Sequence, residues 1–354
     1  MDKKSLKTKR SWKCSPTQVI LLGFLAAIAV GTLLLCLPFA TKSREPAPFM
    51  DALFTATTSV CVTGLTTVDI AGYFSLFGHI VILILMQCGG LGIITFTTAA
   101  LLLLRKKITL RDRIVLEEAF ELNHLNGLLR FVIKVFKGTF LVESIGVVLS
   151  AIAFVPVYGP KGIWYALFHS VSSFCNAGME ILESDSLTAF SDHVLLNGTT
   201  MFLIVAGGLG FPVWWNIIDS LKCVIKEKKP LRNGLRKLSL HSKIVLSTTI
   251  GLILVGAAFY FFLEKDNPGT LGGKPLPQQL LMSVFQSVTM RTAGFYTFSQ
   301  ENLTDAGSFI SIILNFIGGS PVGTAGGLKT TTTAVIALSA IALIRGRQET
   351  SIFC

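Results

Sequence analysis

Three short segments of this sequence combine residue types suited to holding a cation stripped of its water. They are Ala52–Leu65, Ala166–Met179 and Met282–Phe295, and they align without gaps. Each consists of an amphipathic run, then Ser- and Thr-rich residues, then one glycine followed by a large apolar residue. The glycines lie 114 and 116 residues apart. A fixed period of this size predicts an internally repeated membrane protein.

The chemistry expected of such a segment is cation coordination by backbone carbonyls, which replace the water around the ion. Glycine permits the backbone angles that a tight turn needs, and Ser and Thr hydroxyls can brace that turn. A short helix before the turn would aim its negative C-terminal end at the ion. Small residues that permit close helix packing are the alternative explanation, but three aligned copies favour a filter. The predicted filter walls are Cys61, Val62, Thr63 and Gly64, then Cys175, Asn176, Ala177 and Gly178, then Arg291, Thr292, Ala293 and Gly294.

Apolar spans must position these segments. With 51% hydrophobic and 14% charged residues and a mean hydropathy of +0.65, the chain is too apolar for a protein with a water-exposed surface. Each segment lies between two spans long enough to cross a bilayer, at residues 17–40 and 75–103, 128–157 and 192–221, and 240–263 and 305–344. The segments themselves are too short and polar to cross, so re-entrant loops are expected. The predicted fold is therefore an all-α polytopic membrane protein with three tandem helix–pore loop–helix repeats, potassium-channel-like and pseudo-symmetric around a pore.

The net charge of +11 is explained by membrane topology rather than by nucleic-acid binding. Most of the 31 Lys and Arg residues precede the first span or fall in alternate connections, as the positive-inside rule predicts. This pattern places the N-terminus in the cytoplasm and all three loops outside. The first span lacks a following small-residue cleavage site and is expected to be retained. The predicted segments are a basic tail (1–16), repeat 1 (17–104), a connection (105–127), repeat 2 (128–221), a basic loop (222–239), repeat 3 (240–345) and a C-terminal end (346–354).

The last span is interrupted by residues that a continuous helix does not accommodate. Pro321 and several glycines fall within 318–330, whereas the equivalent places in the other repeats have fewer breakers. We expect this interruption, in the third repeat alone, to be a gate below the filter; a kinked helix with a snorkelling Lys329 is the alternative. A nucleotide-binding loop is disfavoured because Leu328 stands where glycine is required. The predicted gate residues are Gly318, Gly319, Ser320, Pro321, Gly323, Thr324, Gly326, Gly327 and Lys329.

Other ionisable residues fall in or beside the spans. Arg291 either lines the pore or forms an ion pair behind the third loop, and the ion pair is favoured because a cation would oppose potassium binding. Glu143 lies mid-span, where a coupling-ion role and a structural hydrogen bond are both open. Four carboxylates follow the loops and either attract cations or are solvated loop charges: Asp69, Glu180, Glu183 and Asp185. The seven cysteines are irregularly spaced and predict neither a disulfide framework nor a metal site.

The loop sequences Ser59–Leu65, Ser173–Met179 and Thr289–Phe295 resemble the filter loops of the Trk/Ktr/HKT superfamily. The closest resemblance is to the Ktr-type (KtrB-like) membrane subunit of bacteria. This implies potassium as the transported ion, since the family has one filter glycine per repeat and a Ser at the first goes with sodium preference. It also implies a gating loop at the interruption, a homodimer in the cell membrane, a cytoplasmic nucleotide-binding ring as partner, and no covalent cofactor. Sodium is a candidate coupling ion.

Three functional hypotheses follow. The first is the ion-conducting subunit of a potassium uptake system. The second is a non-conducting remnant or assembly component, since the superfamily has four repeats and three are counted here. The third, a membrane enzyme, is ranked last because the sequence offers no paired carboxylates, metal-ligand cluster or nucleophile–base set.

Overall fold

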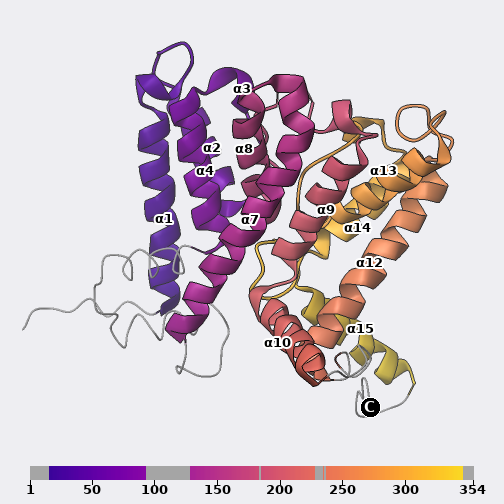
Figure 1. The fold of residues 1–354 in the computed structure, drawn as a ribbon. Coiled ribbons are helices and arrows are strands. Elements are labelled where there is room, and N and C mark those ends of the chain that lie inside the picture. The colour runs from indigo at the N-terminus through magenta and orange to yellow at the C-terminus, as the bar shows by residue number, and fades with distance from the viewer. Residues whose placement is uncertain (1–15, 93–127, 183–184, 228–233, 235–236, 346–354) are drawn as a thin grey trace, which may run out of the picture.

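Within the described residues, the regular structure is helical. The computed structural model describes residues 16–92, 128–182, 185–227, 234 and 237–345. The helices form three successive groups of the same design, in which a short helix that ends in a loop lies between two other helical elements (Figure 1). The fold class predicted from the sequence is therefore confirmed.

Each repeat has an outer helix, a short pore helix and an inner helix. In repeat 1 these are α1 (Pro16–Leu35), α2 (Phe49–Cys61) and α4 (Leu76–Gly90), with the one-turn α3 (Ile70–Tyr73) before α4. In repeat 2 they are α7 (Leu128–Tyr158), α8 (Lys161–Cys175) and α9 (Val194–Gly208), continued by α10 (Phe211–Glu227). In repeat 3 they are α12 (Leu240–Glu264), α13 (Leu276–Thr289) and α14 (Asp305–Phe316), continued by α15 (Thr330–Ile344).

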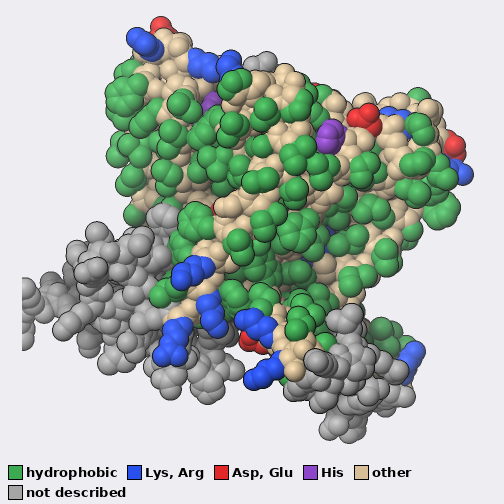
Figure 2. All heavy atoms as spheres, in the orientation of Figure 1, with side chains coloured by type: hydrophobic (Ala, Val, Ile, Leu, Met, Phe, Trp, Pro, Cys, Tyr) green, Lys and Arg blue, Asp and Glu red, His purple; other side chains and the backbone are tan. Residues whose placement is uncertain are grey.

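The outer helices are suited to a bilayer by length and composition. Three stretches of the described chain are long and apolar enough to cross a membrane: Thr17–Leu35, Arg130–Tyr158 and Leu240–Glu264. The bent pair Val194–Gly208 and Phe211–Lys226 makes a fourth when taken as one span. Figure 2 shows hydrophobic side chains over most of the visible face, with several Lys and Arg at the end where α7 begins and α10 lies and others at the opposite end. An apolar band between two ends that carry charged residues fits a multi-pass membrane protein.

The three pore helices are short because their ends are fixed by the sequence. Pro48, Pro160 and Pro275 each stand immediately before the first residue of a pore helix. Proline there is favourable because its fixed backbone angle suits a helix start and its missing N–H would be unpaired anyway. At 13, 15 and 14 residues, the pore helices reach about 20 Å, short of the roughly 30 Å of a bilayer core.

Interruption of an inner helix is not confined to the third repeat, so that expectation was wrong. In repeat 2, α9 and α10 meet at an angle of 103°. Gly210, between them, has a φ of +85°, a conformation that glycine adopts without steric cost. Repeat 1 has a matching glycine after α4, Gly92 with a φ of +80°. The predicted span 75–103 is described only as far as residue 92, and the rest of it lies outside the described residues.

Inner helices approach the pore helices at glycines. A Cβ atom on Gly89 would overlap the carbonyl oxygen of Val60 near the end of α2, and one on Gly207 would overlap that of Phe174 near the end of α8. The two contacts occupy equivalent places in repeats 1 and 2. In these two repeats the inner helix therefore supports the C-terminal end of its own pore helix at backbone distance.

This packing predicts that Gly89→Ala destabilises the protein. The added methyl group cannot be placed without moving α4 away from α2, and overpacking of this kind costs about 1–3 kcal/mol. The measurement is the thermal unfolding midpoint of the purified protein in detergent. Gly251→Ala in α12 is the control, because a Cβ there meets nothing within 4 Å. Equal midpoints for the two variants would contradict the close approach of α4 and α2.

Candidate ion path

The three loops after the pore helices share one backbone conformation. Val62, Asn176 and Thr292 have left-handed φ angles of 55°, 57° and 67°. Two residues later, the filter glycines Gly64, Gly178 and Gly294 have φ angles of 81°, 64° and 88°. Non-glycine residues rarely adopt positive φ, so its recurrence at one place in all three repeats marks a constrained turn.

Pore-helix hydroxyls brace each turn, as expected from the Ser- and Thr-rich composition. Thr58 Oγ1 accepts a hydrogen bond from Leu65 N at 3.1 Å. Ser172 Oγ donates to Met179 O at 2.7 Å and accepts from Met179 N at 3.0 Å. Thr289 Oγ1 donates to Phe295 O at 2.6 Å. In every repeat the hydroxyl therefore holds the large apolar residue that follows the filter glycine.

The loops converge on one another. A Cβ on Gly64 would lie 2.7 Å from Ala177 O, and one on Gly178 would lie 2.5 Å from Ala293 O. A Cβ on Gly294 would lie 3.0 Å from Gly178 Cα. Loop 2 thus lies between loops 1 and 3, and the approach is close enough that only glycine fits without displacement. Carbonyl oxygens of loops 2 and 3 thus lie against the glycines of the adjacent loops.

The exposure of the loop residues follows from the position of loop 2 between loops 1 and 3. In loop 2, Cys175, Asn176 and Ala177 are at most 1% exposed. In loop 1, Cys61 is exposed and Leu65 is 62% exposed, and in loop 3 Gly294 is exposed. The second loop is therefore the one enclosed on both sides by protein.

The predicted gate is a closed loop between α14 and α15. Its ends pair at the bridge between Ile317 and Leu328, where Leu328 N donates to Phe316 O at 2.9 Å. The loop rests on the break in repeat 2: Ser320 N donates to Gly208 O at 2.8 Å, and Thr324 N donates to Gly207 O at 3.0 Å. The break between α9 and α10 thus supplies carbonyl acceptors for otherwise unpaired gate backbone.

The gate loop also contacts two filter loops directly. Asn176 Nδ2 donates to Thr324 Oγ1 at 2.8 Å, and the same hydroxyl donates to Phe174 O at 2.8 Å. Gly326 N donates to Thr292 Oγ1 at 3.0 Å. The gate loop is therefore hydrogen-bonded to Asn176 of loop 2 and Thr292 of loop 3, the residues with left-handed φ angles. Moving the gate loop must break these bonds.

The ion pair expected for Arg291 is not found in the part of the chain that the structure describes. Arg291 is 5% exposed, and its Nη2 donates to Gly318 O in the gate loop at 3.3 Å. The guanidinium thus contacts gate backbone instead of a carboxylate. Lys329 stands at the start of α15, where its Nζ donates to Ala325 O at 2.9 Å. Both cations are held by the gate loop.

The carboxylates after the loops have different surroundings. Asp69 accepts from Ala71 N and Gly72 N at the start of α3, a structural cap. Glu180 lies 3.6 Å from His169 Nδ1, and Asp185 is exposed. Burial, with Asp185 and Glu180 nearby, raises the pKa of Tyr296 beside loop 3. The predicted Glu183 lies outside the described residues.

Glu143 on α7 is 4% exposed and accepts a hydrogen bond from Gln87 Nε2 on α4 at 3.2 Å. The structural hydrogen bond considered for Glu143 is therefore present. Gln87 was not identified from the sequence, since nothing local distinguishes one glutamine in an apolar span.

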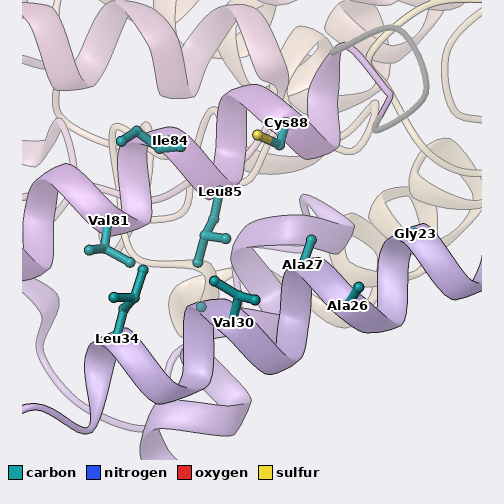
Figure 3. Close-up of a pocket in the computed structure, with 10 residues that line it drawn as sticks. Gly23, Ala26, Ala27, Val30, Leu34, Val81, Ile84, Leu85 and Cys88 are labelled. Atoms are coloured by element: carbon teal, nitrogen blue, oxygen red, sulfur yellow. The ribbon is translucent and has the colours of Figure 1, made fainter. Parts of the chain in front are cut away.

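Two hollows lie away from the loops. An apolar groove of about 410 Å³ separates part of α1 from α4, with Leu85 and Val30 pointing into it (Figure 3). Carbon and sulfur atoms dominate its lining, so it offers no coordination for a cation. Another hollow, of about 570 Å³, is lined by Lys42, Lys161 and Asp69, among other residues, and its two lysines outnumber its one carboxylate, so its charge opposes cation entry. Neither competes with the converging loops as an ion site.

Non-helical backbone enclosed between apolar helices, with three glycine turns in mutual contact, is typical of a pore-loop membrane protein of the cation-channel type. Comparison with known proteins agrees. The family model described as "TrkH: Cation transport protein" matches residues 16–353. The chain belongs to this family.

Individual relatives give the same result. The chain is 38% identical over 349 residues to the potassium/sodium uptake protein NtpJ of Enterococcus hirae, covering 98% of this chain and 74% of that protein. It is 36% identical over 340 residues to the Ktr system potassium uptake protein B of Bacillus subtilis, covering 96% and 73%. The crystal structure of the potassium transporter TrkH from Vibrio parahaemolyticus matches with a TM-score of 0.64 at 19% identity, over 97% of this chain and 66% of that one. The Ktr-type assignment made from the loops is confirmed.

The contacts of Thr324 predict that Thr324→Val destabilises the protein. Valine keeps the shape but leaves Phe174 O and Asn176 Nδ2 without their partner, and an unpaired buried polar group costs about 1–3 kcal/mol. Thermal unfolding in detergent measures this loss. Thr333→Val is the matched control, because within the described part of the chain its hydroxyl bonds only to Lys329 O at 3.3 Å, one turn back. A Thr324 variant as stable as the control would contradict the link between gate and filter.

Proposed function

We propose that this chain is the ion-translocating subunit of a potassium uptake system in the cell membrane, with its N-terminus in the cytoplasm. The observation that carries the proposal is the convergence of three glycine turns at contact distance. Support also comes from relatives named for potassium uptake over most of this chain's length. Potassium binds to backbone carbonyls at residues 61–64, 175–178 and 291–294, and a cytoplasmic nucleotide-binding ring and a second copy of the chain are the proposed partners.

The mechanism follows from the backbone. Potassium leaves water at the outer mouth and is received by loop carbonyls, so that dehydration is offset by coordination. The C-terminal ends of α2, α8 and α13 add negative potential at the same place. Below the loops, residues 317–329 close the path, with the positive charges of Arg291 and Lys329 on the gate backbone opposing an ion there. Sodium remains the proposed coupling ion.

Potassium uptake into cells that lack their own uptake systems tests the proposal. The wild-type chain is expected to restore uptake, and Gly178→Ala is expected to lower it at least about tenfold, since carbonyl geometry at the filter sets conduction. Gly198→Ala is the matched control, because a Cβ there meets nothing within 4 Å. Immunoblotting of membranes confirms equal amounts of each protein.

Wild-type protein that is present in the membrane but gives no uptake would overturn the proposal and favour a non-conducting component of such a system. Uptake that Gly178→Ala leaves unchanged would remove loop 2 from the ion path.

The gate part of the proposal makes a separate prediction. Deletion of residues 319–327 removes the loop that rests on Gly207 and Gly208, so the path below the filter widens. Potassium flux into proteoliposomes is expected to rise at least about threefold, because a steric and electrostatic barrier to conduction is lost. Size-exclusion chromatography checks that the variant remains folded. A folded deletion variant with unchanged or lower flux would contradict gating by this loop.

A further inference from the structure

Glu143 lies at the junction of repeats 1 and 2, behind the filter. Its Oε2 accepts from Gln87 Nε2 at 3.2 Å, which joins α7 of repeat 2 to α4 of repeat 1. Its backbone oxygen accepts from Ser170 Oγ of α8 at 2.8 Å. The side chains of Glu143 and Gln87 are nearly excluded from solvent, at 4% and 6% exposure. The carboxyl group thus occupies a fixed place among three helices.

Gln87 carries this fixed position to the filter. Its Oε1 accepts a hydrogen bond from Cys175 Sγ at 3.6 Å, and Cys175 is the first residue of the second filter wall. Cys175 is fully buried, and a Cβ on Gly90 would lie 2.6 Å from its sulfur. The Gln87 amide, which is oriented by Glu143, and the close contact with Gly90 together confine the side chain of Cys175, the residue at which loop 2 begins.

The corresponding residues of the other loops are held differently. Cys61 of loop 1 is exposed. Arg291 of loop 3 bonds to the gate backbone at Gly318. On the other side of loop 2, Asn176 is held by Thr324 of the gate. Loop 2 is therefore anchored at one residue to the gate and at its neighbour to the Glu143–Gln87 pair, which has no contact with the gate among the described residues.

We propose that Glu143 and Gln87 are positioning residues for ion selection: they fix Cys175, and so the carbonyls of the second filter wall, at a spacing that favours potassium over sodium. The inference rests on the proposed function. Selectivity is the property concerned because a shift of loop carbonyls changes which ion is coordinated well, whereas the fold depends on many other contacts.

The two residues act in series in this proposal, which gives a sharp test. Purified full-length protein in proteoliposomes is assayed for potassium and sodium flux. Glu143→Leu and Gln87→Leu are each expected to lower the potassium-to-sodium flux ratio at least about fivefold, and the double variant no further than either single one, because residues of one hydrogen-bonded chain are not additive. Glu143→Gln keeps an oxygen acceptor for Gln87 and is expected to stay within about twofold of wild type.

Thr139→Val is the matched control. Thr139 lies one turn from Glu143 on α7, is fully buried, and its hydroxyl has no hydrogen-bond partner among the residues that the structure describes. Replacing a buried polar group there leaves the Glu143–Gln87 pair intact, so the flux ratio should not change.

A second readout does not depend on conduction. Labelling by a small thiol reagent, located by peptide mass spectrometry, reports the confinement of Cys175 directly. Both Leu variants are expected to label at Cys175 faster than wild type and the Thr139→Val control, while exposed Cys61 labels alike in all proteins.

The positioning role of Glu143 and Gln87 and the proposed transport function can fail separately in these experiments. Unchanged flux ratios, or additive losses in the double variant, would overturn the positioning role. A large decrease in both potassium and sodium flux in Glu143→Gln, with an unchanged flux ratio, would overturn it in favour of an ion-carrying carboxylate. A wild-type protein without flux would overturn the proposed function instead, and unchanged Cys175 labelling would then overturn the positioning role independently.

Discussion

Backbone polar groups that leave the helical hydrogen-bond pattern inside a membrane must find partners there, and the arrangement of the loops and helices in this chain follows from that requirement. Three loops and the gate segment depart from helix at this depth. Their partners come from pore-helix hydroxyls such as Ser172, from side chains such as Asn176, and from the carbonyls left free at Gly207 and Gly208. The carbonyls that remain without protein donors are the ones that can coordinate a cation.

Glycines serve this constraint in two distinct ways. At the filter, Gly64, Gly178 and Gly294 adopt positive φ and let neighbouring loops approach. Behind the filter, Gly89 and Gly207 bring inner helices onto the ends of pore helices. The first group shapes the ion path and the second supports it, so the same residue type serves both selection and stability.

The arrangement also explains why filter and gate are not independent in this family member. Loop 2 is bonded to the gate through Asn176 and Thr324, and loop 3 through Thr292 and Gly326. The break in the inner helix of repeat 2 carries the gate of repeat 3. In the proposed mechanism, movement of residues 317–329 would therefore be transmitted to loops 2 and 3, while the Glu143–Gln87 pair would hold Cys175 from the opposite side.

The helical membrane class, the three repeats with their loop glycines and the interruption near Pro321 can be predicted from the amino-acid order, because apolar length, periodicity and backbone-breaking residues are local properties. The bend between α9 and α10, the bond of Arg291 to the backbone of residue 318 and the meeting of Gln87 with Glu143 become visible only in the folded chain. Those contacts join residues 27 and 56 positions apart. They depend on how the helices pack, and no local pattern in the sequence records that packing.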